Sequence, residues 1–101
     1  MPTWEEIAGW ISFEKVSYVE IPASSNPTLV YREVNGEVLI DKGVEEAEEL
    51  IVAFRAQGNR YGQWYCSVYR SNSGQYYLKA EWIPEVGHAW EETVIYRLNL
   101  R

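Results

Sequence analysis

Residues 64–83 have the sequence WYCSVYRSNSGQYYLKAEWI, which is typical of a β-hairpin. Two runs rich in aromatic and β-branched residues flank a cluster of turn-forming residues. We take the loop to be Asn72 to Gly74, with Gly74 in the left-handed backbone conformation that glycine adopts most easily. Ser71 then faces Gln75, and this pairing sets the register of both strands.

The register divides this hairpin into an apolar face and a tyrosine-rich face. The apolar face pairs Trp64 with Trp82, Cys66 with Ala80 and Val68 with Leu78. The opposite face pairs Tyr65 with Glu81, Ser67 with Lys79 and Tyr69 with Tyr77. We expect the first face to be core and the second to be a surface or a site. A shift of one residue would exchange the two faces.

Length and cysteine content favour one domain without cross-links. The chain has 101 residues, which suits a single domain over residues 1–101. Its one cysteine excludes an internal disulfide and a cysteine-based zinc site. Because no signal peptide or membrane-spanning run is evident, we expect a cytoplasmic protein.

Charge and aromatic content indicate the kind of partner. The formal net charge is −6, which argues against binding to nucleic acid or to an anionic membrane and suits a basic protein. Eight Tyr and five Trp outnumber two Phe. Tyr and Trp join a large apolar ring to a polar group, so they suit interfaces. We therefore expect another protein as the partner, with no nucleic acid and no membrane.

The segments before residue 42 predict one helix and three strands. A capping box at its start predicts a helix over residues 4–11, and residues 15–21 predict a strand. Asn35-Gly36 between two alternating runs predicts a type I′ turn that joins strands 28–34 and 37–41. The expected pairs are Val34–Glu37, Arg32–Leu39 and Tyr31–Ile40, with Leu29, Tyr31, Val38 and Ile40 on the core face.

Residues 44–57 predict a second helix. Its apolar stripe at a spacing of 3.6 consists of Val44, Ala47, Leu50, Ile51 and Phe54. Gly58 follows where a C-terminal cap belongs. With a last strand at 92–100, the predicted order is α-β-β-β-α-β-β-β. The sequence thus predicts an α+β fold, in which helices pack on one face of a mainly antiparallel sheet.

The residues that could carry catalysis do not form a recognisable set. Cys66 and His88 could pair as nucleophile and base, but the register places the thiol on the apolar face, where it packs as a small hydrophobe. A lone histidine is a poor metal site. Glu81 is the best acid–base candidate, yet no second member of a motif accompanies it. We predict no enzyme, no catalytic residue, no metal site and no cofactor.

Protein binding is the predicted function, most concretely as an inhibitor of the immunity, antitoxin-like or anti-defence kind. The predicted contact residues are Glu45, Glu46, Glu48 and Glu49 on the outer face of the second helix, together with Tyr65, Tyr69, Tyr77 and Glu81. The glutamates would dock on a basic surface and the tyrosines would supply aromatic anchors.

Three other interpretations fit the same residues. The glutamates could simply keep a helix face solvated, and the tyrosines could simply stabilise a strand pair. The domain could instead bind a small ligand in a pocket lined by Trp and Tyr. Finally, a homodimer could form through an edge strand, for which residues 92–100 are the candidate.

Overall fold

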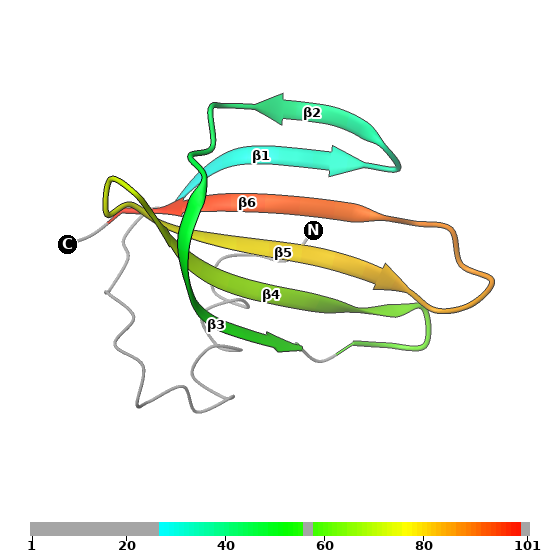
Figure 1. Ribbon diagram of the computed structural model, residues 1–101. Coiled ribbons are helices and arrows are strands. Elements are labelled where there is room, and N and C mark those ends of the chain that lie inside the picture. The colour runs from blue at the N-terminus through cyan, green and yellow to red at the C-terminus, as the bar shows by residue number, and fades with distance from the viewer. Residues whose placement is uncertain (1–26, 56–57, 100–101) are drawn as a thin grey trace.

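The computed structural model describes residues 27–55 and 58–99, which form a six-stranded antiparallel sheet (Figure 1). The strands are β1 (Thr28–Val34), β2 (Glu37–Asp41), β3 (Ala47–Arg55), β4 (Gly62–Ser71), β5 (Tyr76–Pro84) and β6 (Glu92–Leu98). Their spatial order is β2-β1-β6-β5-β4-β3. The predicted helix at 4–11 and strand at 15–21 lie outside the described residues.

The predicted α+β fold is wrong for the described part of the chain, because it contains strands and no helix. Residues 42–46 are an irregular connection, and the rest of the predicted helix at 44–57 is mainly β3. Two bulges interrupt the pairing of β3 with β4. A bulge adds a residue and so breaks the alternation of faces, which leaves apolar side chains at a spacing that resembles a helix. The pairing of residues 47–55 with β4 outweighs the local preference of this segment for a helix.

Gly58 therefore caps no helix. It lies just before β4, where its backbone approaches Gly62 and Gln63 so closely that a Cβ atom would collide with them. Glycine is required at this position because the two segments are in near contact.

The β4–β5 hairpin has the predicted register. Its pairs include Trp64–Trp82, Cys66–Ala80, Val68–Leu78, Tyr65–Glu81, Ser67–Lys79 and Tyr69–Tyr77. The Ser71 amide donates to the Gln75 carbonyl at 2.9 Å, and Gly74 has φ = 85°. The Gln75 amide also donates to the Ser71 hydroxyl at 3.2 Å. The three-residue loop is therefore confirmed.

The β1–β2 hairpin is confirmed at its turn and differs further along. Asn35 and Gly36 have φ values of 48° and 83°, and Val34 pairs with Glu37. A bulge then moves the register by one residue, so that Arg32 pairs with Ile40. The buried residue of β1 is Val30, and the β2 residues Val38 and Leu39 are about half exposed. The predicted shared core face is accordingly wrong, because Leu29 and Tyr31 pack against clusters on opposite faces of the sheet and Val38 is about half exposed.

The main core covers one face of the sheet. Its buried members are Phe54, Cys66, Val68, Leu78, Ala80, Val94, Tyr96 and Leu98. Four of the residues predicted for the apolar hairpin face are thus core, whereas Trp64 and Trp82 are only partly buried. These two tryptophans lie toward the end of the sheet that is remote from the Asn72–Gly74 loop.

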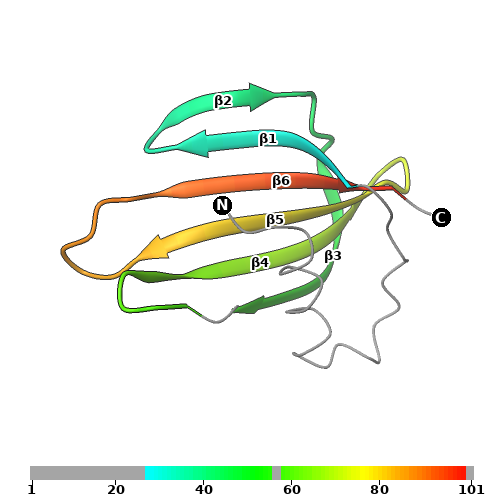
Figure 2. The ribbon, with the colours of Figure 1, turned by 180° about the vertical axis from the view of Figure 1, so that it is seen from behind.

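A smaller cluster occupies the opposite face, where Val30, Tyr69, Tyr77 and Ile95 are buried. Val44 from the connection between β2 and β3 packs against it. Figures 1 and 2 show the path of the chain that brings Val44 to this face. The chain passes from the β2 edge to the β4 edge, and β3 crosses one face of the strongly twisted sheet on the way. The crossing segment covers tyrosines that a flat sheet would expose.

Within residues 27–55 and 58–99, the edges of the sheet are β2 and β3, since β6 lies between β1 and β5. The expectation that residues 92–100 form an edge is therefore wrong. In the described ranges, no helix is long and apolar enough to cross a membrane.

Replacing Leu78 with Ala should lower the free energy of unfolding by about 2–5 kcal/mol, because it leaves a cavity in the main core. Urea unfolding followed by tryptophan fluorescence measures the change. Val86→Ala is the control, because Val86 is fully exposed. A change at Leu78 as small as that at Val86 would show that the core is placed wrongly.

Candidate functional site

The four predicted glutamates lie along an exposed edge rather than on a helix. Glu45 and Glu46 are in the connection before β3, and Glu48 and Glu49 are in β3 itself. The Glu45 carboxylate accepts a hydrogen bond from the Ser73 hydroxyl at 2.6 Å, which lowers its pKa. Glu49 pairs with Arg70 at 2.6 Å. Within the described residues, Glu46 and Glu48 have no hydrogen-bond or ion-pair partner.

The predicted tyrosine anchors are mostly covered. Tyr69 and Tyr77 are 8% and 3% exposed, and their rings stack with centroids 5.4 Å apart. Burial, with a smaller effect of Tyr77, raises the pKa of Tyr69 to about 12. Tyr65 is partly buried. In this arrangement little of either ring is left exposed for contact with a partner.

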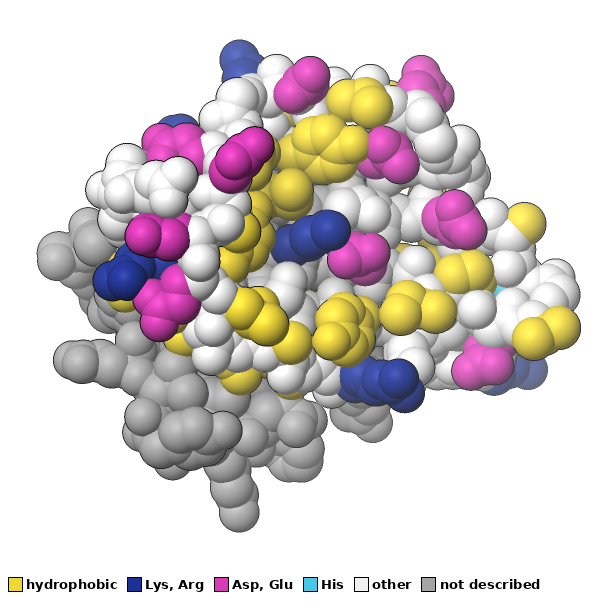
Figure 3. Space-filling model, viewed as in Figure 1, with side chains coloured by type: hydrophobic (Ala, Val, Ile, Leu, Met, Phe, Trp, Pro, Cys, Tyr) yellow, Lys and Arg dark blue, Asp and Glu magenta, His cyan; other side chains and the backbone are white. Residues whose placement is uncertain are grey.

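Glu81 remains accessible on the same face. Its side chain is 41% exposed and forms an ion pair with Lys79 at 3.2 Å. A hollow of about 360 Å³ next to Lys79 is lined by Glu45, Ala47, Leu50, Ser67, Tyr69, Lys79 and Ile95, and we call it the β3 groove. The groove brings the predicted glutamate segment and the predicted tyrosine face together. Figure 3 shows hydrophobic side chains across this side of the molecule with acidic side chains around them.

Cys66 and His88 do not form a catalytic pair. Cys66 is fully buried in the middle of β4, and burial raises the pKa of its thiol to about 12. His88 is exposed in the loop after β5, and its ring lies perpendicular to the Tyr61 ring, with centroids 5.0 Å apart. Among the described residues, no three or more His, Cys, Asp or Glu side chains are grouped so that they could hold a metal ion.

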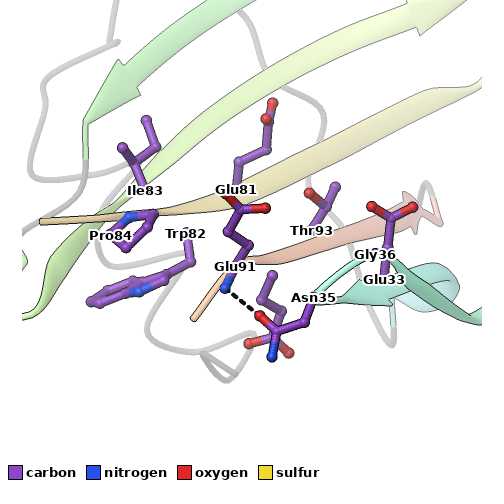
Figure 4. Close-up of a pocket in the computed structure, with 10 residues that line it drawn as sticks. Glu33, Asn35, Gly36, Glu81, Trp82, Ile83, Pro84, Glu91 and Thr93 are labelled. Carbon is purple, nitrogen blue, oxygen red and sulfur yellow. Dashed lines mark hydrogen bonds between the residues drawn. The ribbon is translucent and has the colours of Figure 1, made fainter. Parts of the chain in front are cut away.

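An acidic pocket of about 260 Å³ lies at the end of the sheet that carries the β1–β2 turn (Figure 4). Its carboxylates come from Glu33 in β1, Glu81 in β5, Glu91 just before β6 and Glu92 at the start of β6. Asn35 ties the turn to the residue before β6 through two hydrogen bonds. Its side-chain oxygen accepts from the Glu91 backbone amide at 2.8 Å, and its own backbone amide donates to the Glu91 carbonyl at 2.9 Å.

A second hollow of about 300 Å³ adjoins the acidic pocket and shares Trp82 and Glu92 with it. Its lining residues are Asn59, Tyr61, Trp64, Trp82, Trp90 and Glu92, and we call it the aromatic pocket. The rings of Trp64 and Trp82 meet edge to face with centroids 5.4 Å apart. Tyr61 and Trp90 are 45% and 51% exposed and form the rim.

Backbone hydrogen bonds hold the rim of the aromatic pocket in place. The Glu85 amide donates to the Tyr61 carbonyl at 2.9 Å, which ties the loop after β5 to the turn before β4. The Tyr61 amide donates to the Asn59 side-chain oxygen at 2.8 Å. Tyr61 and Trp90 were not predicted as site residues, because both lie in connections whose proximity only the folded sheet creates.

Glu92 is a buried carboxylate in the wall of both pockets. Its side chain is 2% exposed, and its Oε1 accepts a hydrogen bond from Nε of Arg32 at 3.0 Å. Burial raises the pKa of nearby Tyr96, and the Glu92 carboxylate adds to this effect while Arg32 opposes it. A buried ion of this kind needs its partner, because an unpaired charge is costly away from water.

Compared with known proteins, the chain matches no family model, no curated protein and no solved structure.

The buried thiol should make the protein less stable in alkali. The unfolded chain releases the Cys66 proton near pH 9, whereas the folded chain keeps it to about pH 12. Stability is therefore full below about pH 9 and falls as the pH rises through this window. Tyr69 acts in the same sense between pH 10 and about 12. The test compares the free energies of unfolding at pH 8 and pH 11.

Cys66→Ala provides the control, since it removes the thiol contribution and keeps that of the tyrosine. Its stability should fall less between the two pH values than that of the natural chain. An equal fall in both proteins would contradict a buried thiol with a raised pKa.

Glu92→Gln should destabilise the fold by about 1–3 kcal/mol, because Arg32 loses a charge-assisted hydrogen bond. Thermal unfolding measures the effect. Glu91→Gln is the matched control, as the neighbouring side chain is exposed and a change within about 0.5 kcal/mol is expected. Equal stability of the two variants would show that the Arg32–Glu92 pair contributes nothing.

Proposed function

We propose that this protein is a cytoplasmic, non-enzymatic module that binds a partner protein with a basic surface, most concretely as an inhibitor of that partner. The observation that carries the proposal is the exposed acidic edge at the start of β3. There Glu46 and Glu48 have no partner among the described residues, and the neighbouring Leu50 is 64% exposed. We call residues 45–50 the acidic edge.

The acidic edge combines three features that a binding surface needs. Exposed carboxylates attract a basic partner and raise the association rate more than the affinity. Leu50 and the β3 groove beside it offer apolar contact area next to the charges. In the described part of the chain, β3 pairs with β4 alone, so its outer backbone groups can accept a strand from a partner.

The chemistry of the described residues supports binding rather than catalysis. The one thiol is buried in its neutral form and lies in a different element from the exposed imidazole. Glu81 lines the acidic pocket, but its side chain is 41% exposed and paired with Lys79. The net charge of −6 disfavours nucleic acid and anionic membranes.

Reversing the charges at Glu46 and Glu48 together, to Lys, should slow association with the partner at low salt by about tenfold or more. The partner is first captured with the natural chain as bait and identified by mass spectrometry. Association and dissociation rates are then measured by surface plasmon resonance at several salt concentrations. The slowing should fade at high salt, because screening weakens the attraction.

The matched control is the double reversal Glu37→Lys and Asp41→Lys on β2. It changes the net charge by the same amount on the opposite edge of the sheet. Equal effects of the two double variants would show that total charge alone matters, and the acidic edge would then not be the docking surface. Light scattering on the isolated protein tests whether β2 or β3 pairs with a second copy instead.

A second candidate function, the binding of a small ligand, is favoured by the aromatic pocket. Its volume of about 300 Å³ lies at the lower end of the range for small-molecule sites. It also combines several aromatic walls with a few polar groups, as such sites usually do.

A further inference from the structure

We propose that the aromatic pocket binds an organic cation, namely a methylated or quaternary ammonium group. This inference rests on the second candidate function, and it names the chemical class of the ligand. The pocket lies at the opposite end of β4 and β5 from the Asn72–Gly74 loop, away from the acidic edge.

The rings are arranged as walls and rim of one hollow. Trp64 and Trp82 come from paired positions of β4 and β5 and meet at an interplanar angle of 63°. Trp90 and Tyr61 approach from two connections and stay about half exposed. Rings that meet at such an angle can surround a compact group from more than one side. Indole has the most strongly attracting face for a cation among the aromatic side chains.

The charges of the pocket favour a cation over an anion. The Glu92 carboxylate lies in the wall, the exposed Glu91 follows the rim residue Trp90, and no Lys or Arg is among the described lining residues. Arg32 pairs with Glu92 and so removes part of its charge. The Arg60 guanidinium lies 4.9 Å from the centre of the Tyr61 ring at the rim, and its charge opposes a second cation there, so the proposed ligand contacts the tryptophan faces.

Hydration decides which cation fits. An unmodified ammonium is compact and strongly hydrated, so it loses much on entering an apolar site. A methylated ammonium has fewer or no N–H groups and an apolar outer surface, and it can leave water at small cost. Contact with the tryptophan faces then supplies both apolar burial and electrostatic attraction. A headgroup of this size suits a hollow of about 300 Å³.

The test is a titration of the full chain with choline, followed by NMR through the indole N–H signals of the tryptophans. Its neutral isostere 3,3-dimethylbutan-1-ol is titrated in parallel, with ionic strength matched by NaCl. We expect choline to shift the signals of the pocket tryptophans and to bind at least about 3-fold more tightly than the isostere. A peptide that contains trimethyllysine is titrated next. Tighter binding of this peptide than of choline indicates that the natural ligand group belongs to a protein, and weaker binding indicates a free small molecule.

Trp90→Ala should weaken choline binding by about 2- to 5-fold with little effect on folding, because Trp90 is half exposed. Ile83→Ala is the matched control, as Ile83 is similarly exposed at the same end of the sheet but lines only the acidic pocket. Equal affinity for choline and its isostere would overturn the cation while leaving a small-ligand site. Absence of binding by both compounds would overturn the cation and the small-ligand function together.

Discussion

The structure depends on the pairing of β4 with β5, whose register is set at one point. The Ser71–Gln75 hydrogen bond and the left-handed Gly74 close a three-residue loop. Every pair along both strands follows from that loop, because side chains alternate between faces. Cys66, Val68, Leu78 and Ala80 are thereby all directed to one side, where they are fully or almost fully buried. A loop longer or shorter by one residue would place the apolar residues of one strand opposite the tyrosine-rich face of the other, so that this set would no longer share a face.

The path of β3 then gives the two faces their different roles. The connection that leads into β3 crosses one face, where Val44 packs against the cluster that contains the buried pair Tyr69 and Tyr77. The same path leaves the acidic edge at the surface. At the other end of the sheet, connections before β4 and β6 carry Tyr61 and Trp90 to the partly buried Trp64 and Trp82. Recognition features therefore gather where strands turn or end, as is usual for sites supported by a rigid sheet.

Sequence reasoning succeeded where the decisive contacts are local. Asn35-Gly36 and the Asn72–Gly74 loop predict their hairpins because the backbone conformation of a few residues decides each turn. It failed for β3, where two bulges give apolar residues the spacing of a helix. It also left open whether Tyr69 and Tyr77 are exposed, since the segment that covers them enters from a distant part of the sequence. Both points depend on contacts between segments, which no local pattern reports.

The sequence by itself determined the two hairpins, the apolar identity of the β4–β5 face and the acidic character of the chain. These properties follow from turn chemistry, alternation and composition, and each acts over short distances or over the whole chain. Only the tertiary structure decided that residues 47–55 are an edge strand, that the tyrosine pair is buried and that an aromatic pocket exists. The reason is physical: burial and pocket formation depend on which strands lie side by side, and the order β2-β1-β6-β5-β4-β3 joins segments far apart in the chain.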